Sequence, residues 1–234
     1  MKTIGIHQPN FIPWLGFFNK VYNCDTFILL DDVQFSKGSF TNRCKILDND
    51  NKESWVTLPI TYSFGDKINQ IKLSNSNWKN ILAKQIENFF SNKPEFEKNW
   101  PEIKKEILSI EDSNLSKINF KLIVFMLKKM DIKRKIIFSS DFNLKLKSTE
   151  LLIELIKEVS NESIYLSGSG AKNYQDENLF KKSKIKIVYK NYMSPKYPQI
   201  NQKNFYSGLS ILDAIFNVGW EKTKNLVKIN ISKK

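Results

Sequence analysis

Residues 3–30 follow a strand, loop, helix, strand pattern that few folds can accommodate. Residues 3–7 alternate around β-branched side chains as a strand does, and Pro9 and Pro13 exclude a helix from the next segment. The apolar residues 14–21 predict a helix, and the continuous apolar run 26–30 predicts a strand that is buried on both faces. A strand, a helix and a strand within about 30 residues form a βαβ unit, whose strands are parallel.

A hairpin pattern follows this unit. Residues 40–47 and 55–60 flank the polar segment 48–51, which predicts two antiparallel strands joined by a turn. Residues 68–73 predict another short strand. We expect this part of the chain to leave the parallel sheet.

A long helical stretch comes next, before strands and helices alternate again. From residue 77 to about 130 the apolar side chains recur at helical spacing, with breaks expected near Pro94 and Pro101. The later predicted strands are 136–138, 164–166 and 185–189, and the predicted helices are 148–159, 178–182 and 210–218. The sequence therefore predicts an α/β fold: one domain over 1–234, a mostly parallel sheet with helices on both faces, a β-hairpin excursion and a helical insertion at about 77–130.

The formal net charge of +13 raises the question of nucleic-acid binding. Of the 37 basic residues only Arg43 and Arg134 are arginine, and the lysines are spread along the chain among acidic residues. The abundance of Lys, Asn, Ile and Phe is typical of an AT-rich genome, because all four have A/T-rich codons. We therefore predict a basic solvated surface and no nucleic-acid partner.

Metal and membrane chemistry are restricted by what the chain contains. Cys24 and Cys44 are its only cysteines and His7 its only histidine, which is too few for a Cys/His zinc site, so we predict no metal in the site. Magnesium held by carboxylates alone stays open. Since no apolar run approaches a membrane span and no signal-peptide pattern is present, we expect a cytoplasmic protein that is not integral to a membrane.

Polar residues follow several of the predicted strands. In an open parallel sheet, ligands bind outside the carboxyl ends of the strands, so these positions predict a site. They are His7, Gln8 and Asn10 after the first strand, Asp31, Asp32 and Gln34 after the second, Ser139, Ser140 and Asp141 after a later one, and Ser167, Gly168, Ser169 and Gly170 after another.

Four of the candidates suggest specific chemistry. His7 is the natural general acid or base because its ordinary pKa lies near neutrality, although a structural histidine bonded to a loop carbonyl fits equally well. Asp31 and Asp32 cannot point the same way on an extended backbone, so only one should face the site, and an exposed turn is the alternative for both. Arg43 offers a planar group that binds phosphate or carboxylate through two hydrogen bonds, with a surface ion pair as the alternative.

The whole chain resembles the WbqC-like family of bacterial proteins. The most specific segments are residues 6–18, which contain His7-Gln8-Pro9-Asn10, residues 30–35 around Asp31-Asp32, and residues 39–43, which end in Asn42-Arg43. Further matching segments are 165–168, 197–199, 210–213 and 216–219. We see no clear departure from the family pattern.

The resemblance implies a transferase of surface-polysaccharide, or O-antigen, biosynthesis that forms an amide on an aminodeoxysugar, for example by glycyl or other acyl transfer. The sugar is expected on a nucleoside diphosphate or a lipid phosphate. Under this hypothesis His7 takes the proton of the attacking amine, Asp31 or Asp32 orients it, and Arg43 grips a phosphate. The other residues predicted to bind substrate are Gln8, Asn10, Trp14, Gln34, Asn42, Ser167, Gly168 and Gln199. The acyl donor and its carrier stay open between a thioester, an adenylate made in place, and a free amino acid with ATP and magnesium.

A second resemblance gives the alternatives. The opening strand, proline loop, glycine and helix are similar to nucleotidylyltransferase-like enzymes that activate carboxylates as adenylates. Those enzymes use an H-x-G-H signature, and here Trp14-Leu15-Gly16-Phe17 stands in its place without either histidine. The alternatives to the transferase are therefore an ATP-dependent adenylating ligase and a non-catalytic nucleotide-sugar-binding protein.

Overall fold

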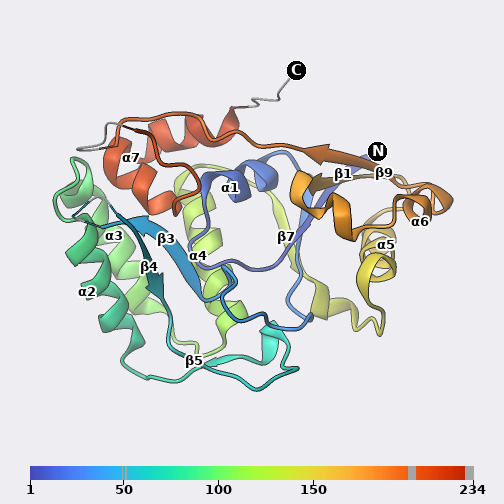
Figure 1. The fold of residues 1–234 in the computed structure, drawn as a ribbon, viewed down its shortest axis with the longest axis horizontal. Helices are drawn as coiled ribbons and strands as arrows, with labels where there is room; N and C mark the ends of the chain where they lie inside the picture. Colours follow the sequence, from blue (N-terminus) through green and yellow to red (C-terminus); the bar gives the residue numbers. More distant parts are fainter. Residues whose placement is uncertain (49, 51, 200–203, 230–234) are drawn as a thin grey trace.

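A parallel sheet forms the centre of the molecule. The computed structural model describes residues 1–48, 50, 52–199 and 204–229. Within this part of the chain the sheet has five parallel strands in the order β7-β2-β1-β8-β9 (Figure 1). The strands are β1 (Lys2–His7), β2 (Thr26–Leu29), β7 (Lys135–Phe138), β8 (Ser163–Gly168) and β9 (Lys186–Lys190). The predicted α/β fold class is confirmed.

The two faces of the sheet are covered by different hydrophobic clusters, because successive residues of a strand point to opposite faces. Ile4 and Ile6 of β1 pack in a cluster with residues of α5 (Ser148–Val159). Gly5 between them faces the other way, where a Cβ atom would lie 2.6 Å from the Cys24 sulfur and 2.9 Å from the Phe27 ring. Glycine therefore lets the opposite cluster reach the backbone of the central strand.

Helices cover both faces, as the sequence predicted. The larger cluster includes α1 (Leu15–Tyr22) and α7 (Ile211–Lys228), and the smaller includes α5 and α6 (Glu177–Lys182). Figure 1 shows α5 and α6 at the right, away from the other helices. The buried Asn19 of α1 donates through Nδ2 to the Val227 carbonyl of α7 at 2.6 Å, so the first helix is bonded to the last.

The predicted hairpin is present as β3 (Arg43–Leu47) and β4 (Glu53–Thr57), although residues 49 and 51 of its turn lie outside the described residues. The strand predicted over 68–73 is wrong for most of its length. Ile68–Gln70 is a 3₁₀ turn, and only β6 (Lys72–Leu73) pairs, with β5 (Ile60–Thr61). Ile68 and Ile71 are both buried, a spacing of three that suits a turn of helix better than a strand.

The stretch predicted to be helical contains α2 (Trp78–Phe90), α3 (Phe96–Ser109) and α4 (Leu115–Lys129). The break near Pro94 is confirmed, since it lies between α2 and α3. The break at Pro101 is wrong, because this proline lies inside α3. Trp100 and Ile103 on either side of it are buried, and their packing keeps the helix continuous although one backbone donor is missing.

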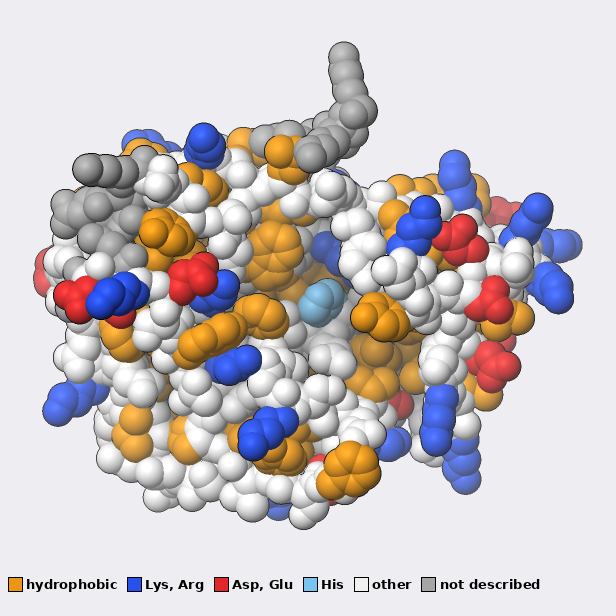
Figure 2. Space-filling model, in the orientation of Figure 1, with side chains coloured by type: hydrophobic (Ala, Val, Ile, Leu, Met, Phe, Trp, Pro, Cys, Tyr) orange, Lys and Arg blue, Asp and Glu red, His pale blue; other side chains and the backbone are white. Residues whose placement is uncertain are grey.

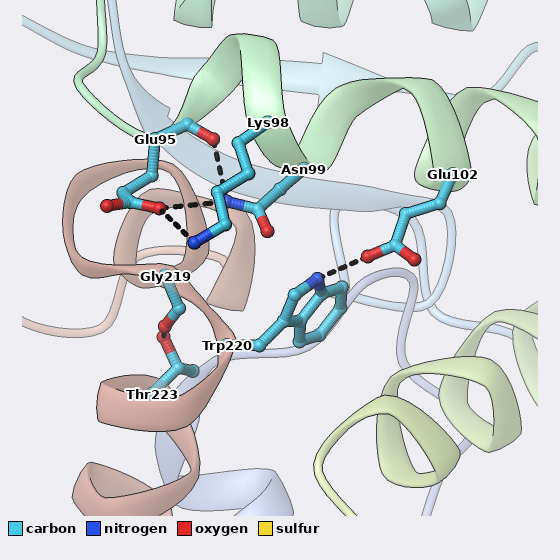
Figure 3. A network of polar contacts seen from close by, with 7 residues as sticks. All are labelled: Glu95, Lys98, Asn99, Glu102, Gly219, Trp220 and Thr223. Atoms are coloured by element: carbon cyan, nitrogen blue, oxygen red, sulfur yellow. Dashed lines mark hydrogen bonds and ion pairs between the residues drawn. The ribbon is translucent and has the colours of Figure 1, made fainter.

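The last helix is longer than predicted because it continues beyond residue 218 through a kink. Gly219 has φ +76°, and a Cβ atom there would lie 3.1 Å from Oε2 of Glu95. Just after the kink, Nε1 of Trp220 donates to Oε1 of Glu102 on α3 at 2.6 Å (Figure 3). Glu102 also accepts from Lys129 of α4 at 2.5 Å, so its carboxylate joins three helices.

Candidate functional site

A cavity of about 190 Å³ opens where the order of the sheet reverses. From β1 the chain builds outward through β2 and β7 on one side, and it returns to β1 to add β8 and β9 on the other. Loops leaving neighbouring strands at such a point diverge and leave a crevice. The lining residues are His7, Trp14, Gly16, Phe17, Asn19, Lys20, Ser167, Gly168, Ser169, Gly170, Lys190, Asn191 and Tyr192. We call this the switch-point cavity, and Figure 2 shows the histidine side chain inside a hollow of the surface.

His7 is held in one orientation at the end of β1. Its Nδ1 lies 2.9 Å from the Gln8 carbonyl oxygen, which can only accept, so Nδ1 carries the proton and Nε2 keeps its lone pair. The ring packs edge-on against Phe17, with 5.3 Å between centroids. Burial, helped by the charge of Lys20, lowers the pKa of His7 to about 4. The imidazole is therefore neutral at pH 7 and can accept a proton.

Two lysines border the same cavity. Nζ of Lys20, on α1, donates to the Ile6 carbonyl at 2.7 Å, and burial lowers the pKa of this lysine to about 8. Lys190, at the end of β9, also has its pKa lowered by burial. With a pKa of about 8, Lys20 is still mostly protonated at pH 7, so the cavity presents positive charge beside a neutral imidazole.

Aromatic side chains form one wall. The indole of Trp14 covers Gly16, where a Cβ atom would lie 2.3 Å from the ring. Trp14 also packs edge-on against Tyr192, with 5.4 Å between centroids. Among the described residues the buried Tyr192 hydroxyl has no hydrogen-bond partner, and burial raises its pKa. A glycine at position 16 is therefore required for the tryptophan to reach the cavity.

Six of the residues that the sequence singled out meet here: His7, Trp14, Ser167, Gly168, Ser169 and Gly170. Ser167 is buried and its hydroxyl lies 3.2 Å from Oε1 of Gln175. Gln8 contributes its backbone carbonyl to His7, and its side chain is half-buried. The other predicted residues lie apart from this lining.

Asp31 is buried within a group of serines. Its Oδ1 accepts from the Ser140 backbone N–H at 3.1 Å and from the Ser139 hydroxyl at 3.2 Å, and its Oδ2 accepts from the Ser140 hydroxyl at 3.0 Å. The Ser116 hydroxyl of α4 lies 3.4 Å from Oδ2. Burial raises the pKa of Asp31. These contacts join the end of β2 to the end of β7 and to α4.

Asp32 and Gln34 line a second cavity, of about 660 Å³, at the β2 and β7 side of the sheet. It also contains Lys67, Lys145 and Lys147. Asp32 accepts a short hydrogen bond from the Ser139 hydroxyl, which also faces Asp31. Of the two neighbouring carboxylates, Asp32 is thus the one that faces a cavity.

The predicted amide and arginine contacts are internal to the chain. Asn10 is buried, and Asn42 donates to the Leu58 carbonyl at 3.3 Å. Arg43 donates to the Gly38 carbonyl and lies over the Trp55 ring, 4.0 Å from its centroid. The contacts of Asn42 and Arg43 shape the hairpin and the loop before it.

Gln199 bonds to several groups near the start of α7. Its Nε2 donates to Oδ2 of Asp213 at 3.0 Å and to the Tyr206 carbonyl at 2.9 Å, while its Oε1 accepts from the Tyr206 N–H at 2.8 Å. Tyr197 also donates to Asp213, at 2.7 Å. Asp213 is fully buried, and burial raises its pKa. Gln199 is therefore bonded to a buried carboxyl group.

Sequence reasoning missed Lys20, Lys190, Tyr192 and Asn119. The two lysines gave little signal because lysines are spread throughout the chain, although Gly16 and Lys20 share a helix face at a spacing of four. Asn119 of α4 is fully buried, and its Nδ2 donates to the carbonyls of Pro9 and Thr41, both at 2.7 Å. It therefore fixes the proline loop that leads from His7 to Trp14.

Comparison with known proteins assigns the chain to a family. The sequence profile of the WbqC-like protein family matches residues 8–225. The chain belongs to the WbqC-like family. An uncharacterized protein of Mycobacterium tuberculosis is 30% identical over 224 residues, which cover 94% of this chain and 96% of that protein. No solved structure matches.

The family segments of this WbqC-like protein divide between the cavity and its supports. Residues 6–18 supply His7, the proline loop, Trp14 and the start of α1, and residues 165–168 supply the opposite wall. Residues 30–35 and 39–43 contain the buried Asp31 and the hairpin arginine. In the described part of the WbqC-like chain, no three His, Cys, Asp or Glu side chains gather as metal ligands do, and no helix has the length and apolarity to span a bilayer.

Proposed function

We propose that the protein is a cytoplasmic transferase of surface-polysaccharide assembly that forms an amide on an amino sugar carried by a nucleoside diphosphate or a lipid phosphate. Family membership and the switch-point cavity support this proposal, and the observation that carries it is the neutral His7 with its Nε2 lone pair free of the Gln8 contact. Acyl transfer to an amine needs a group that removes the amine proton as the new bond forms.

In the proposed reaction, the sugar amine attacks the carbonyl carbon of an activated acyl group. The C–N bond forms, Nε2 of His7 accepts the amine proton, and the bond to the leaving group breaks with its electron pair. The leaving group takes that proton if the donor is a thioester, or departs as AMP if the donor is an adenylate. The Gln8 carbonyl holds the opposite side of the imidazole and stabilises the cation that forms.

Mass spectrometry of reaction mixtures tests the proposal. Purified protein is incubated with nucleotide-linked amino sugars and either acyl thioesters or an amino acid with ATP and magnesium, and the expected product is the N-acylated sugar. His7→Gln should lower its rate by ~100-fold or more while circular dichroism shows an intact fold. A rate that His7→Gln leaves unchanged would exclude His7 as the base.

The second candidate is an adenylating ligase, favoured by the position of Trp14-Leu15-Gly16-Phe17 in the cavity wall. The ring of Phe17 cannot donate a hydrogen bond to phosphate oxygens, which counts against it. Release of AMP from ATP in the presence of a carboxylate, without any amino sugar, would support this candidate. Binding of the sugar with no product from any donor would instead favour a non-catalytic nucleotide-sugar-binding protein.

A further inference from the structure

The described lining of the switch-point cavity carries basic side chains but no acidic ones. Lys20 and Lys190 line it, and none of its described lining residues is acidic. Both lysines also act on the buried Cys24 thiol, where their charges oppose the rise in its pKa that burial causes. Two partly buried cations without a carboxylate in the lining create a site for an anion.

Lys20 is positioned to bind a ligand. An ammonium group has three N–H donors, and the Ile6 carbonyl accepts one of them. That bond fixes Nζ beside the carboxyl end of β1, next to His7. The partly buried ammonium has lost part of its hydration, and a bound anion would restore favourable interactions.

The opposite wall allows a ligand to approach the backbone. Gly168 and Gly170 line the cavity, and a Cβ atom at either position would meet nothing within 4 Å. Ser169 lies between them in sequence and also lines the cavity. Small residues of this kind let oxygen-rich groups come close to main-chain atoms.

We propose that the switch-point cavity binds the phosphoryl group of the carrier, with Lys20 and Lys190 as its cationic partners. This inference rests on the proposed function and names which part of the substrate the cavity takes. A volume of about 190 Å³ equals roughly six water molecules at ~30 Å³ each, so the cavity has room for a phosphate or diphosphate and the rest of the carrier extends outside. In this proposal the two lysines bind the phosphate in place of Arg43, whose guanidinium is bonded to the Gly38 carbonyl.

An anion in this cavity changes the chemistry of His7. The charged or titratable lining residues around the imidazole are Lys20 on α1, Lys190 on β9 and Tyr192 beyond it. Lys20 lowers the pKa of His7 in the free protein, and a phosphate between them would oppose that effect. Phosphate binding would therefore make His7 a stronger base when the substrate is in place.

The experiment uses the single histidine as a reporter. Because His7 is the only histidine, its ring Cε1–H signal in the NMR spectrum needs no assignment by mutation. The pKa of His7 is measured by pH titration of the protein alone and with inorganic pyrophosphate. We expect a pKa near 4 in the free protein and a rise by ~1 unit or more with pyrophosphate.

Four variants locate the anion. Lys20→Gln and Lys190→Gln should each weaken pyrophosphate binding by ~10-fold or more and reduce the response of His7, whereas Arg43→Gln should keep that response. Lys105→Gln, which removes an exposed lysine of α3, is the matched control for loss of one positive charge. If Lys20→Gln does not fold, Lys190→Gln and the titration of the wild type still test whether the cavity binds the anion. Loss of binding in Arg43→Gln alone, or no response of His7 to saturating pyrophosphate, would overturn the proposal.

Two further titrants distinguish the source of the phosphoryl group. UDP represents a nucleotide carrier and a short-chain prenyl monophosphate represents a lipid carrier, and the tighter ligand identifies the carrier class. Pyrophosphate binding without any acylated sugar would leave the anion site standing and remove the proposed function. Acylation at the wild-type rate in both lysine variants would support the proposed function and exclude the anion site.

Discussion

Asp31 and Ser140 are joined by two hydrogen bonds, one from the serine backbone N–H to Oδ1 at 3.1 Å and one from its hydroxyl to Oδ2 at 3.0 Å. The pair connects β2 to the segment after β7, across 109 residues of sequence. A carboxylate used in this way acts as part of the framework that holds the sheet edge together.

Asp31→Ala should therefore destabilise the protein by about 2–4 kcal/mol, because buried serine and backbone donors lose their acceptor. Urea denaturation measures the free energy of unfolding. Asp32→Ala is the matched control. It should lose less stability because Asp32 is only half-buried and, within the described residues, accepts a hydrogen bond from Ser139 alone. Equal losses of stability in the two variants would contradict the structural role of Asp31. If Asp32→Ala folds, its rate of product formation tests whether Asp32 takes part in the reaction.

The kink in α7 predicts an asymmetry between two glycines with the same backbone angle. Gly208 and Gly219 both have φ +76°, but only Gly219 faces a neighbour, Oε2 of Glu95. Gly208→Ala should cost about 1 kcal/mol from backbone strain alone, and Gly219→Ala about 1 kcal/mol more as Glu95 is displaced. Thermal unfolding of both variants measures the difference. Equal melting temperatures would show that Glu95 moves aside without loss.

Stability should fall in acid because of His7. Its pKa is about 4 in the folded protein and near 6.5 in the unfolded chain, so only the unfolded chain binds the proton between these values. The contribution of the neutral ring is present above pH 6.5 and is lost toward pH 4, at up to about 1.4 kcal/mol per pH unit. Urea denaturation of wild type and His7→Gln at several pH values measures it. The wild type should lose stability more steeply in this range, and parallel curves would refute the low pKa.

Although Asn119 is distant from the proline loop in sequence, we expect it to contribute measurably to the stability of that loop. Asn119→Ala leaves the buried carbonyls of Pro9 and Thr41 without a donor, and we expect a loss of about 1–3 kcal/mol. The loss is limited because Oδ1 of Asn119 has no partner in the part of the chain that the structure describes, so its removal relieves the cost of burying an unpaired oxygen. Asn80→Ala, on the exposed face of α2, should change the free energy of unfolding by less than about 0.5 kcal/mol. Similar values for the two variants would contradict the bridging role.

The sequence predicted the fold well where periodicity carries the signal. Helix 148–159 and the strands of the sheet follow from apolar spacing, whereas the 3₁₀ turn at 68–70 and the helix through Pro101 depend on packing partners distant in sequence. The rule that ligands bind at the carboxyl ends of strands selected His7 and Ser167, and the structure places both in the lining of one cavity. It could not separate them from Asp31, because a polar residue after a strand can equally bond to serines 85 to 109 residues away.

The bond between Asn19 and Val227 spans 208 residues, and it has a consequence for synthesis on the ribosome. His7 and the proline loop emerge well before β8, β9 and α7, which complete and brace the cavity. Contacts between such distant segments form only after the intervening chain is available. A nascent chain therefore carries the imidazole long before it has the opposite wall, and ligand binding begins only after β8, β9 and α7 have emerged.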